Sequence, residues 1–466
     1  MQHVTTAWIA APALGSSTLP TLLAAVVAVH LAVIVVHRPQ RGLLVLAALL
    51  PFDGLLLIIP GGDAVGPWKE GLLAVTLLAS LVAPRSARGE PLTKLPAWVP
   101  AAVVFVALGA VSAISVGGIL GTWGFKIDFL YVAVPIVLWR CPFDERERDR
   151  LVSILMVTGA ITAVFGLVQQ VLGAPRLNAL GWEYNTVIRF SGGLLRSFST
   201  FTQPFSFGLF ITLVLLVCLP VAMADHRRPR NLAFLVASPV LVLGMAASVV
   251  RGATLGLLAG LLVLMVWRFR GLFHALVPGA LALLLVPASV ITAYFSSSSL
   301  DERTTGWSTI IRIVAERPLG NGIGTTGAAA AKSLELGADP AGLITTSGTE
   351  LYLPDNLYIK TVLELGPLGL WVLLLLGATV ISAAVAASRR TFGNDRALAQ
   401  GIAASVVGAA AASTVSTYLE IFPLDFYFWL LVGVLLCLDR TSSSTRSPSV
   451  PGEAASRPTS ASSSVP

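Results

Sequence analysis

The segment 203–223, with the sequence QPFSFGLFITLVLLVCLPVAM, decides how this chain folds. It holds no charged residue, and the residues that follow it, 224–230 with the sequence ADHRRPR, hold three arginines. A bilayer core about 30 Å thick is crossed by a helix of roughly 20 apolar residues. Because Lys and Arg gather at the cytoplasmic ends of such helices, the segment predicts a transmembrane helix that enters from the outside.

The same pattern recurs along the 466 residues, of which 55% are hydrophobic and 12% are charged. This balance is typical of multi-span membrane proteins, and a helix satisfies its backbone amides inside the bilayer. We therefore expect an all-α, polytopic membrane helix bundle of about 12–13 transmembrane helices over residues 1–440. The tail, 441–466, is rich in Ser and Pro and is predicted to be disordered and cytoplasmic. The spans are predicted at 20–36, 42–59, 67–83, 98–116, 127–139, 151–173, 203–223, 231–250, 252–267, 271–294, 356–385, 397–418 and 423–438.

Most of the 31 Lys and Arg fall in loops on one side of these spans, and that side is therefore predicted to be cytoplasmic. The other side, which is predicted to be extracytoplasmic, has the remaining basic residues at helix ends and in loops. They are Lys69, Lys126, Arg176, Arg189, Arg196, Arg251, Arg303, Arg312, Arg317, Lys332 and Lys360. Because topology does not explain this second group, its members are candidates for function.

The composition also argues against several kinds of site. The three cysteines, Cys141, Cys218 and Cys437, offer neither a disulfide framework nor a metal-ligand spacing. The five histidines are scattered along the chain. A pI near 9.6 follows from the basic cytoplasmic loops and does not indicate nucleic-acid binding. We expect no metal, no cofactor and no nucleic-acid partner.

Two outer segments, 174–202 and 295–355, are long enough to carry a site, since loops of such length are commonly functional. The second has an apolar pattern at helical spacing, formed by Trp307, Ile310, Ile311 and Val314. It predicts an amphipathic helix that ends at Pro318 and lies along the membrane surface with this face buried.

A glycine-rich turn, Gly320-Asn-Gly-Ile-Gly324, follows this helix. It resembles a phosphate-binding loop in composition, but a dinucleotide fingerprint follows a strand and opens a helix in a βαβ unit. We expect a helix stop with a flexible hinge. Contact between the backbone of the turn and a ligand phosphate is the alternative.

Arg251 lies between two apolar runs, in the sequence SVVRGATLG, with no room for a loop. An arginine at membrane depth is costly unless it is paired or hydrated, and such residues are usually functional. Arg196, which begins the polar segment 196–204 before a span, and Arg303 are predicted to act with it. The alternative for all three is contact between the guanidinium and lipid headgroups.

Several arginines near one membrane face suit a pyrophosphate, because a guanidinium binds phosphate oxygens bidentately and stays charged. If a lipid pyrophosphate is the leaving group of a glycosyl transfer, negative charge develops on it and fixed cations stabilise the transition state. Such a reaction requires no metal. Lys69 is a further candidate contact, although its neighbour Glu70 offers local pairing, as Asp128 does for Lys126.

A glycosyl transfer also needs a base for the acceptor hydroxyl. Asp355, at the end of the long loop and the start of a span, is the best-placed candidate. The sequence Pro354-Asp-Asn356 also predicts a helix N-cap here, and the two roles are compatible. Glu364 is expected to pair with Lys360, four residues earlier, and Glu350 is a second outer carboxylate.

Three blocks of the chain resemble the O-antigen ligase and polymerase superfamily of bacterial envelope proteins. The first is Arg196–Pro204, in which Ser199-Thr200-Phe201 is similar to a Gly-Thr-Phe-like step, while Gln203-Pro204-Phe205 departs from an Asn-Pro-Asn-like end. The second is Arg251-Gly252-Ala253, with Val250 in place of the family's serine. The third comprises Arg303-Thr-Thr-Gly-Trp307, Glu316-Arg-Pro-Leu-Gly320-Asn-Gly-Ile-Gly324, Asp355-Asn-Leu-Tyr358 and Leu363-Glu-Leu-Gly-Pro-Leu-Gly369. The blocks follow the family's order over residues 190–370.

The resemblance implies transfer of a glycan from an undecaprenyl-pyrophosphate carrier to a glycan or glycolipid acceptor. The reaction would take place on the outer leaflet of the bacterial cytoplasmic (inner) membrane. It implies that Arg196 and Arg251 bind the pyrophosphate, that Arg303 assists, and that Asp355 replaces the family's ligase histidine. It also suggests Trp307, Asn356, Tyr358 and Glu364 as substrate contacts. A carboxylate, with a reference pKa of about 3.9, is a weak base, so a polymerase is supported at least as well as a ligase.

Two other classes of protein fit the composition. A transporter or flippase for lipid-linked glycans would favour internal repeats and charges near the membrane midplane. The chain shows no repeat, and its unexplained charges gather at one face. A non-catalytic scaffold of a polysaccharide export complex is the third reading.

Overall fold

The computed structural model describes residues 33–84, 95–267, 307–339, 343–346 and 350–444. The elements, in chain order, are α2 (Gln40–Leu49), η1 (Leu50–Ile58), α3 (Gly62–Val65), α4 (Trp68–Val82), α5 (Trp98–Val116), α6 (Gly118–Phe129), η3 (Leu130–Val132), α7 (Ala133–Arg140), α8 (Glu145–Ala179), β1 (Arg189–Ser191), β2 (Leu194–Arg196), α9 (Pro204–Ala224), α10 (Pro229–Ala247), α11 (Arg251–Trp267), α15 (Trp307–Glu316), α16 (Gly327–Glu335), β3 (Thr345–Thr346), β4 (Glu350–Leu351), α17 (Leu357–Arg390), α18 (Gly393–Ala412), η5 (Tyr418–Glu420) and α19 (Leu424–Ser444).

The chain is an all-α, multi-pass membrane bundle, which confirms the predicted fold class. Seven helical segments of the described chain are long and apolar enough to cross a membrane, and α11 and α19 add shorter apolar helices. The strands of the described residues form two short antiparallel pairs, β1–β2 and β3–β4. In the first pair Arg189 lies opposite Arg196.

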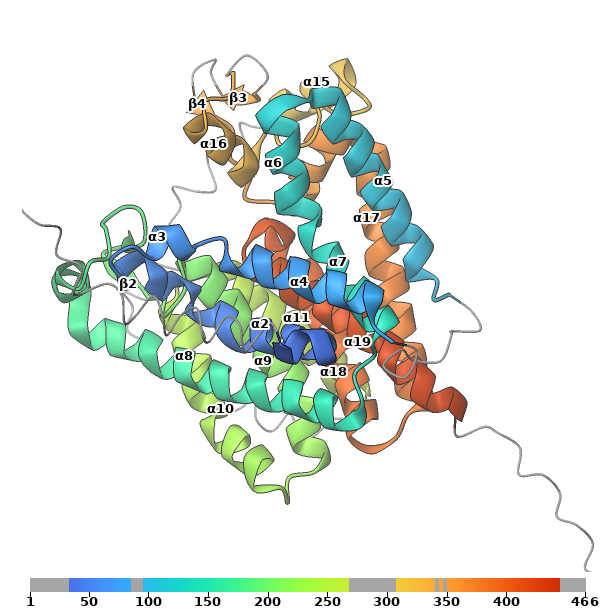
Figure 1. Ribbon diagram of the computed structural model, residues 1–466. Coiled ribbons are helices and arrows are strands. Elements are labelled where there is room, and N and C mark those ends of the chain that lie inside the picture. The colour runs from blue at the N-terminus through green and yellow to red at the C-terminus, as the bar shows by residue number, and fades with distance from the viewer. Residues whose placement is uncertain (1–32, 85–94, 268–306, 340–342, 347–349, 445–466) are drawn as a thin grey trace, which may run out of the picture.

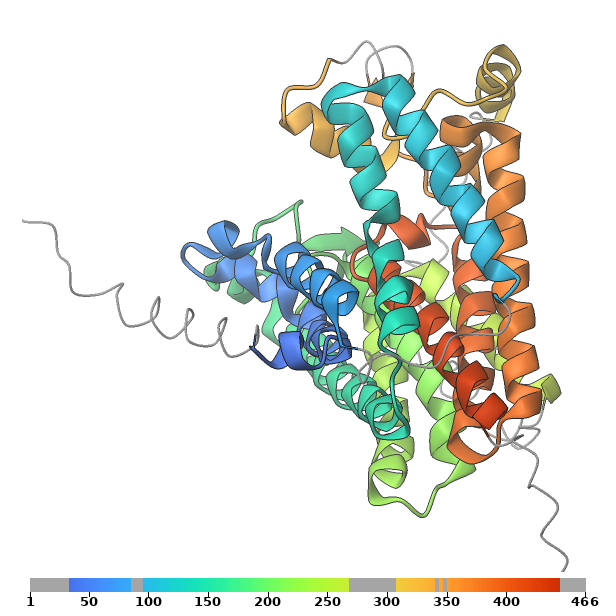
Figure 2. The ribbon, with the colours of Figure 1, turned by 45° about the vertical axis from the view of Figure 1, so that its right-hand side comes forward.

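Helix α9 is the core of the bundle, because it is hydrophobic on every side. Of the residues in its most apolar stretch, 83% are buried. It packs against α8, α10, α11 and α18. Helices α5 and α17 lie side by side beyond this group, and α6 meets α5 at one end (Figures 1 and 2). Elements α15, α16, β3 and β4 gather at that same end, where α16 contacts α6 and α15 contacts α17.

Several predicted boundaries are wrong for local reasons. The span predicted at 127–139 is part of a longer segment, Gly118–Arg140, which begins at the sharp corner made by Gly117 and Gly118. Both glycines have positive φ, so the corner requires no loop between α5 and α6. The span predicted at 151–173 continues to Ala179 across a kink at Gly173. The predicted spans 20–36 and 271–294 fall mostly or wholly outside the described residues.

The amphipathic helix of the outer loop is present as α15, but its buried face packs on protein. Ile310 is buried in a cluster with Ile344 and Leu363 of α17, whereas Ile311 is 65% exposed. The apolar face predicted for this helix was therefore too wide, because it included the exposed Ile311. Helix α19 runs to Ser444, past the predicted start of the tail at 441.

Candidate functional site

The segment that follows Arg196 is rigid and buried. Gln169 of α8 accepts hydrogen bonds from the backbone N–H groups of Phe198 and Ser199, at 3.1 and 2.7 Å, and donates to the Ser199 carbonyl at 2.8 Å. Ser199 has a φ of 55°, in the left-handed region that few non-glycine residues adopt. These contacts fix the backbone between β2 and α9, and with it the position of Arg196.

Arg196 itself is half-buried at the end of β2. Its guanidinium lies 4.7 Å from the centre of the Phe205 ring, in cation–π geometry. Its Nε donates a hydrogen bond of 3.4 Å to the carbonyl of Ser248. The arginine is therefore held between the start of α9 and the end of α10.

The break between α10 and α11, which precedes Arg251, lies beside the Arg196 segment. Val249, in the short break after α10, has a φ of 51°, and Arg251 is the first residue of α11. The N–H of Ser197 donates to the carbonyl of Ala247 at 3.0 Å. Arg251 thus stands at the positive N-terminal end of a 17-residue helix, where anions are favoured.

A turn at residues 413–416 links this region to the start of α17. The N–H of Leu357 donates to the Ser413 carbonyl at 3.0 Å, and the Asn356 amide donates to the Thr414 carbonyl at 2.8 Å. On the other side, a Cβ at Gly252 would lie 3.5 Å from the Ser416 hydroxyl. The neighbours of Arg251 and of Asp355 therefore contact one short turn.

The predicted helix N-cap at the start of α17 is present, and its residue is Asn356. The Asn356 side chain accepts hydrogen bonds from Tyr358 and Ile359 N–H, at 2.8 and 3.1 Å. The Tyr358 hydroxyl donates to the Ala410 carbonyl at 2.7 Å. The Asp355 side chain is exposed and precedes the cap. Trp307 is the first residue of α15, and Arg303 lies outside the described residues.

Three of the lysines that were predicted to be extracytoplasmic, Lys69, Lys126 and Lys360, pair with carboxylates on other elements. Local pairing was predicted for Lys69 and Lys126, and it is wrong because residues i and i+1 or i+2 on a helix point in different directions. The observed pairs, each joining two elements, are Lys69–Asp53 at 2.7 Å, Lys126–Glu70 at 2.9 Å and Lys360–Asp128 at 2.8 Å. They connect η1, α4, α6 and α17 in sequence. Lys69 also lies 4.3 Å above the ring of Phe422.

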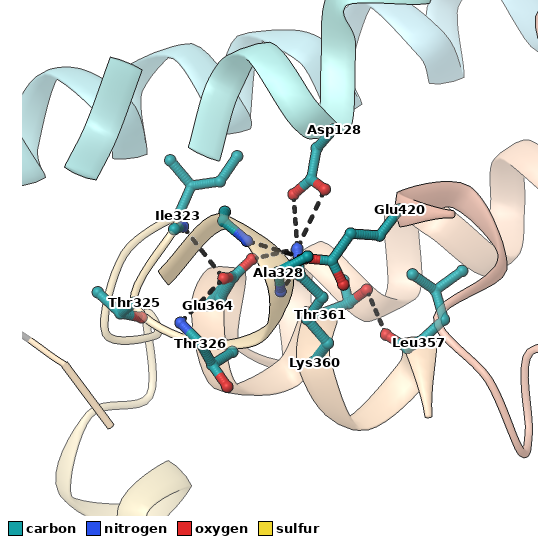
Figure 3. A network of polar contacts seen from close by, with 12 residues as sticks. Asp128, Ile323, Thr325, Thr326, Ala328, Leu357, Lys360, Thr361, Glu364 and Glu420 are labelled. Carbon is teal, nitrogen blue, oxygen red and sulfur yellow. Dashed lines mark hydrogen bonds and ion pairs between the residues drawn. The ribbon is translucent and has the colours of Figure 1, made fainter. Parts of the chain in front are cut away.

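A buried ionic network lies where α6, α17 and the outer loop meet (Figure 3). The Lys360 ammonium donates to Asp128 and to Glu364, each at 2.8 Å, and the second contact confirms the predicted Lys360–Glu364 pair. The Glu364 carboxylate also accepts from the N–H groups of Gly324 at 3.0 Å and Thr326 at 3.4 Å. Lys360 and Glu364 are each 2% exposed.

Glu420 of η5 completes this network from a second side. Its carboxylate accepts from the N–H groups of Ala328 and Ala329, at 2.7 and 3.3 Å, at the start of α16. Burial raises the pKa of the Glu420 carboxyl above its ordinary value, and the Lys360 ammonium opposes that rise. Lys360 therefore stands among three carboxylates, two of which bind loop backbone. Of these three carboxylates, only Glu364 was predicted to pair with Lys360.

The glycine-rich turn is neither a flexible hinge nor a phosphate loop. A Cβ at Gly320, which has a φ of 88°, would overlap the Glu364 carbonyl. The N–H groups of Asn321 and Gly322 donate to the Leu363 and Glu364 carbonyls, at 2.8 and 3.0 Å. The turn requires glycine in order to lie against α17. The N–H groups of Asn321, Gly322 and Gly324 donate to this helix, and that of Ile323 donates to the Ser112 hydroxyl of α5.

A groove of about 950 Å³ lies on the other face of this turn. It is lined by the outer end of α5, by Arg317 and the glycine turn, and by Leu365 and Leu368 of α17. Its lining includes Arg317 and the glycine turn but none of Arg196, Arg251 and Asp355. Within the part of the chain that the structure describes, no three His, Cys, Asp or Glu side chains are grouped to hold a metal ion.

No protein-family model matches the chain, and comparison with curated proteins gave no match. Among solved structures, the chain is similar to one from "Structural coordination of polymerization and crosslinking by a peptidoglycan synthase complex". The two are 18% identical, with a TM-score of 0.43, over 75% of this chain and 98% of that chain. A similarity of this size identifies neither a family nor an activity. Fold and composition define the class as an all-α, multi-pass membrane protein.

Proposed function

We propose that the chain is a membrane glycosyltransferase of the O-antigen ligase or polysaccharide polymerase type. It transfers or polymerises oligosaccharide repeats from an undecaprenyl-pyrophosphate carrier on the outer leaflet of the bacterial inner membrane. One observation carries this proposal. Arg196 donates to Ser248, three residues before Arg251, and the turn at 413–416 connects the Arg251 region with Asp355.

The two arginines act on the leaving group. As the bond between the sugar and the pyrophosphate breaks, negative charge develops on the bridging oxygen. Guanidinium groups fixed beside the N-terminus of α11 stabilise that charge more than they stabilise the ground state. Contacts with the Phe205 ring and with the Ser248 carbonyl at the end of α10 hold Arg196 before substrate arrives, so little reorganisation is needed.

Asp355 acts on the acceptor. Its carboxylate takes the proton of the acceptor hydroxyl, the hydroxyl oxygen bonds to the anomeric carbon, and the pyrophosphate leaves with the electron pair of the broken bond. Asp355 is exposed at the outer end of α17, where a hydroxyl can reach it. The acceptor is a glycan or a glycolipid, and membrane lipids surround the bundle.

The other expected contacts divide into two groups. Lys69, Arg303 and Trp307 are proposed to bind the substrate. The polar atoms of Asn356, Tyr358 and Glu364 are occupied by protein groups, at 2.7–3.4 Å, so they are proposed to shape the site from behind.

Substitution of the arginines in the producing cell tests the proposal. Arg251→Ala and Arg196→Ala should abolish polymer while lipid-linked repeats accumulate on the outer leaflet. Arg189→Ala is the matched control, because Arg189 pairs with Arg196 across the β1–β2 hairpin but donates to the Thr186 carbonyl. Repeats that accumulate on the inner leaflet would show a flippase. Unchanged polymer would contradict the proposal.

A further inference from the structure

The residue before the cap of α17 and the charged residues in its first two turns have different surroundings. Asp355, immediately before the cap, is exposed, whereas Lys360 and Glu364 are buried on one face of the helix. Residues four apart on a helix are neighbours, and here the ammonium and carboxylate are 2.8 Å apart. This pair is too enclosed to contact a substrate.

The carboxylate of Glu364 is connected to the Asp355 segment through the outer loop. Its Oε1 accepts from Gly324 and Thr326 N–H. The Thr326 hydroxyl then donates to the Tyr352 carbonyl at 2.6 Å, and Gly327 N–H donates to the same carbonyl at 3.4 Å. Tyr352 lies three residues before Asp355. Two hydrogen bonds, joined through Thr326, therefore connect the buried Glu364 carboxylate with a residue three positions before the exposed Asp355.

Lys360 holds the other end of this connection. It binds Asp128 of α6 as well as Glu364, with Glu420 as the third acidic group near it. An ionised Glu364 without Lys360 would be a buried charge that lacks its partner. If Glu364 then moved or took up a proton, the N–H groups of Gly324 and Thr326 would lose the fixed carboxylate that accepts from them. Asp355 is thus held from two sides, by the cap and turn 413–416 and by the loop at 324–327.

We infer that Glu364 and Lys360 are positioning residues for Asp355. Lys360 fixes the Glu364 carboxylate, Glu364 fixes the loop at residues 324–327, and this loop fixes Tyr352 and the approach to Asp355. The inference rests on the proposed function, in which Asp355 is the base, and adds the residues that set its place.

A double-mutant cycle on the full chain in lipid vesicles tests the inference, with undecaprenyl-pyrophosphate-linked oligosaccharide as donor. Glu364→Ala should lower kcat by about 10- to 100-fold, because small misplacement of a reacting group is costly. The donor KM should stay within about twofold, since Arg196 and Arg251 are untouched. Glu364→Gln, which keeps an acceptor for Gly324 and Thr326, should recover part of kcat. Glu335→Ala, at an exposed carboxylate on α16, is the control.

The decisive comparison is made in the Asp355→Asn background. A positioning residue has nothing left to position there, so Glu364→Ala should cause no further loss of kcat. A loss as large as in the wild-type background would overturn the inference and leave Glu364 with a general structural role. An unchanged kcat in Glu364→Ala alone would overturn it as well.

The same measurements separate this inference from the proposed function. If Asp355→Asn alone has wild-type kcat, the base assignment fails and the positioning role fails with it. If Arg251→Ala also has wild-type activity, the proposed glycosyl transfer at this site fails. If both of these single variants lose activity while Glu364→Ala loses none, only the positioning role is overturned.

Discussion

The Lys360 ammonium lies 2.8 Å from the Glu364 carboxylate, one turn further along α17, and both side chains are 2% exposed. This ion pair is buried near the outer end of a membrane-crossing helix, where charges persist only when paired and hydrogen-bonded. Asp128 and the N–H groups of Gly324 and Thr326 supply the remaining contacts. The pair joins α6, α17 and the outer loop.

Lys360→Met should destabilise the protein strongly. The substitution leaves Asp128 and Glu364 facing each other with no cation between them, and loss of one partner of a buried pair costs about 3–5 kcal/mol. Unfolding followed in detergent measures the change. Lys332→Met is the control, because Lys332 forms an exposed pair with Glu335, worth about 0–1 kcal/mol. Equal stability of the two variants would argue against the network.

Gly320→Ala and Gly337→Ala should differ although both glycines have nearly the same φ, 88° and 87°. In each variant the alanine must adopt the left-handed conformation, which costs about 1–2 kcal/mol. At Gly337 the new Cβ meets nothing within 4 Å, whereas at Gly320 it overlaps the Glu364 carbonyl. We expect Gly320→Ala to cost about 1–3 kcal/mol more. Limited proteolysis of the outer loop should reveal it, and equal cleavage of both variants would contradict the packing.

Asp355→Ala and Asn356→Ala should separate catalysis from helix capping. Asn356→Ala removes the cap of α17 and should cost about 1 kcal/mol of stability. Asp355→Ala keeps this cap and should abolish most transfer. Turnover and thermal unfolding of both variants provide the measurement. A stable, active Asp355→Ala protein would remove Asp355 from the mechanism.

Phe205→Leu should weaken donor binding. The ring contacts the Arg196 guanidinium at 4.7 Å, and such a contact is worth about 0.5–2 kcal/mol. We expect the donor KM to rise by about 2- to 30-fold, since each 1.4 kcal/mol is tenfold. Phe190→Leu, at an exposed ring in β1, is the control. An unchanged donor KM in Phe205→Leu would show that the ring does not hold Arg196 for binding.

The apolar runs were sufficient to predict the helices, because burial in lipid requires long uncharged segments. Segment 203–223 matches α9 to within one residue at each end. The kink at Gly366 could not be predicted, since it depends on what packs against the glycine. A Cβ at Gly366 would overlap the Pro318 carbonyl of the outer loop.

The ion pairs show the limit of sequence reasoning more sharply. Lys360–Glu364 was predictable from its spacing of four residues. Lys69 and Lys126 each have an acidic neighbour within two residues, but both pair with carboxylates on other elements. The hydrogen bonds from the glycine turn to Glu364 could not be predicted either, because every residue other than proline has a backbone N–H group and the sequence does not show where it points.

The most direct test of the central claim measures transfer from an undecaprenyl-pyrophosphate-linked oligosaccharide by the purified chain in vesicles. Arg251→Ala and Arg196→Ala should each lower turnover by about 100- to 1,000-fold, the usual cost of losing one group that stabilises a developing anion. Arg251→Lys should retain an intermediate rate, because it keeps the charge but not the bidentate geometry. Wild-type turnover in both alanine variants would contradict a cationic site for the departing pyrophosphate.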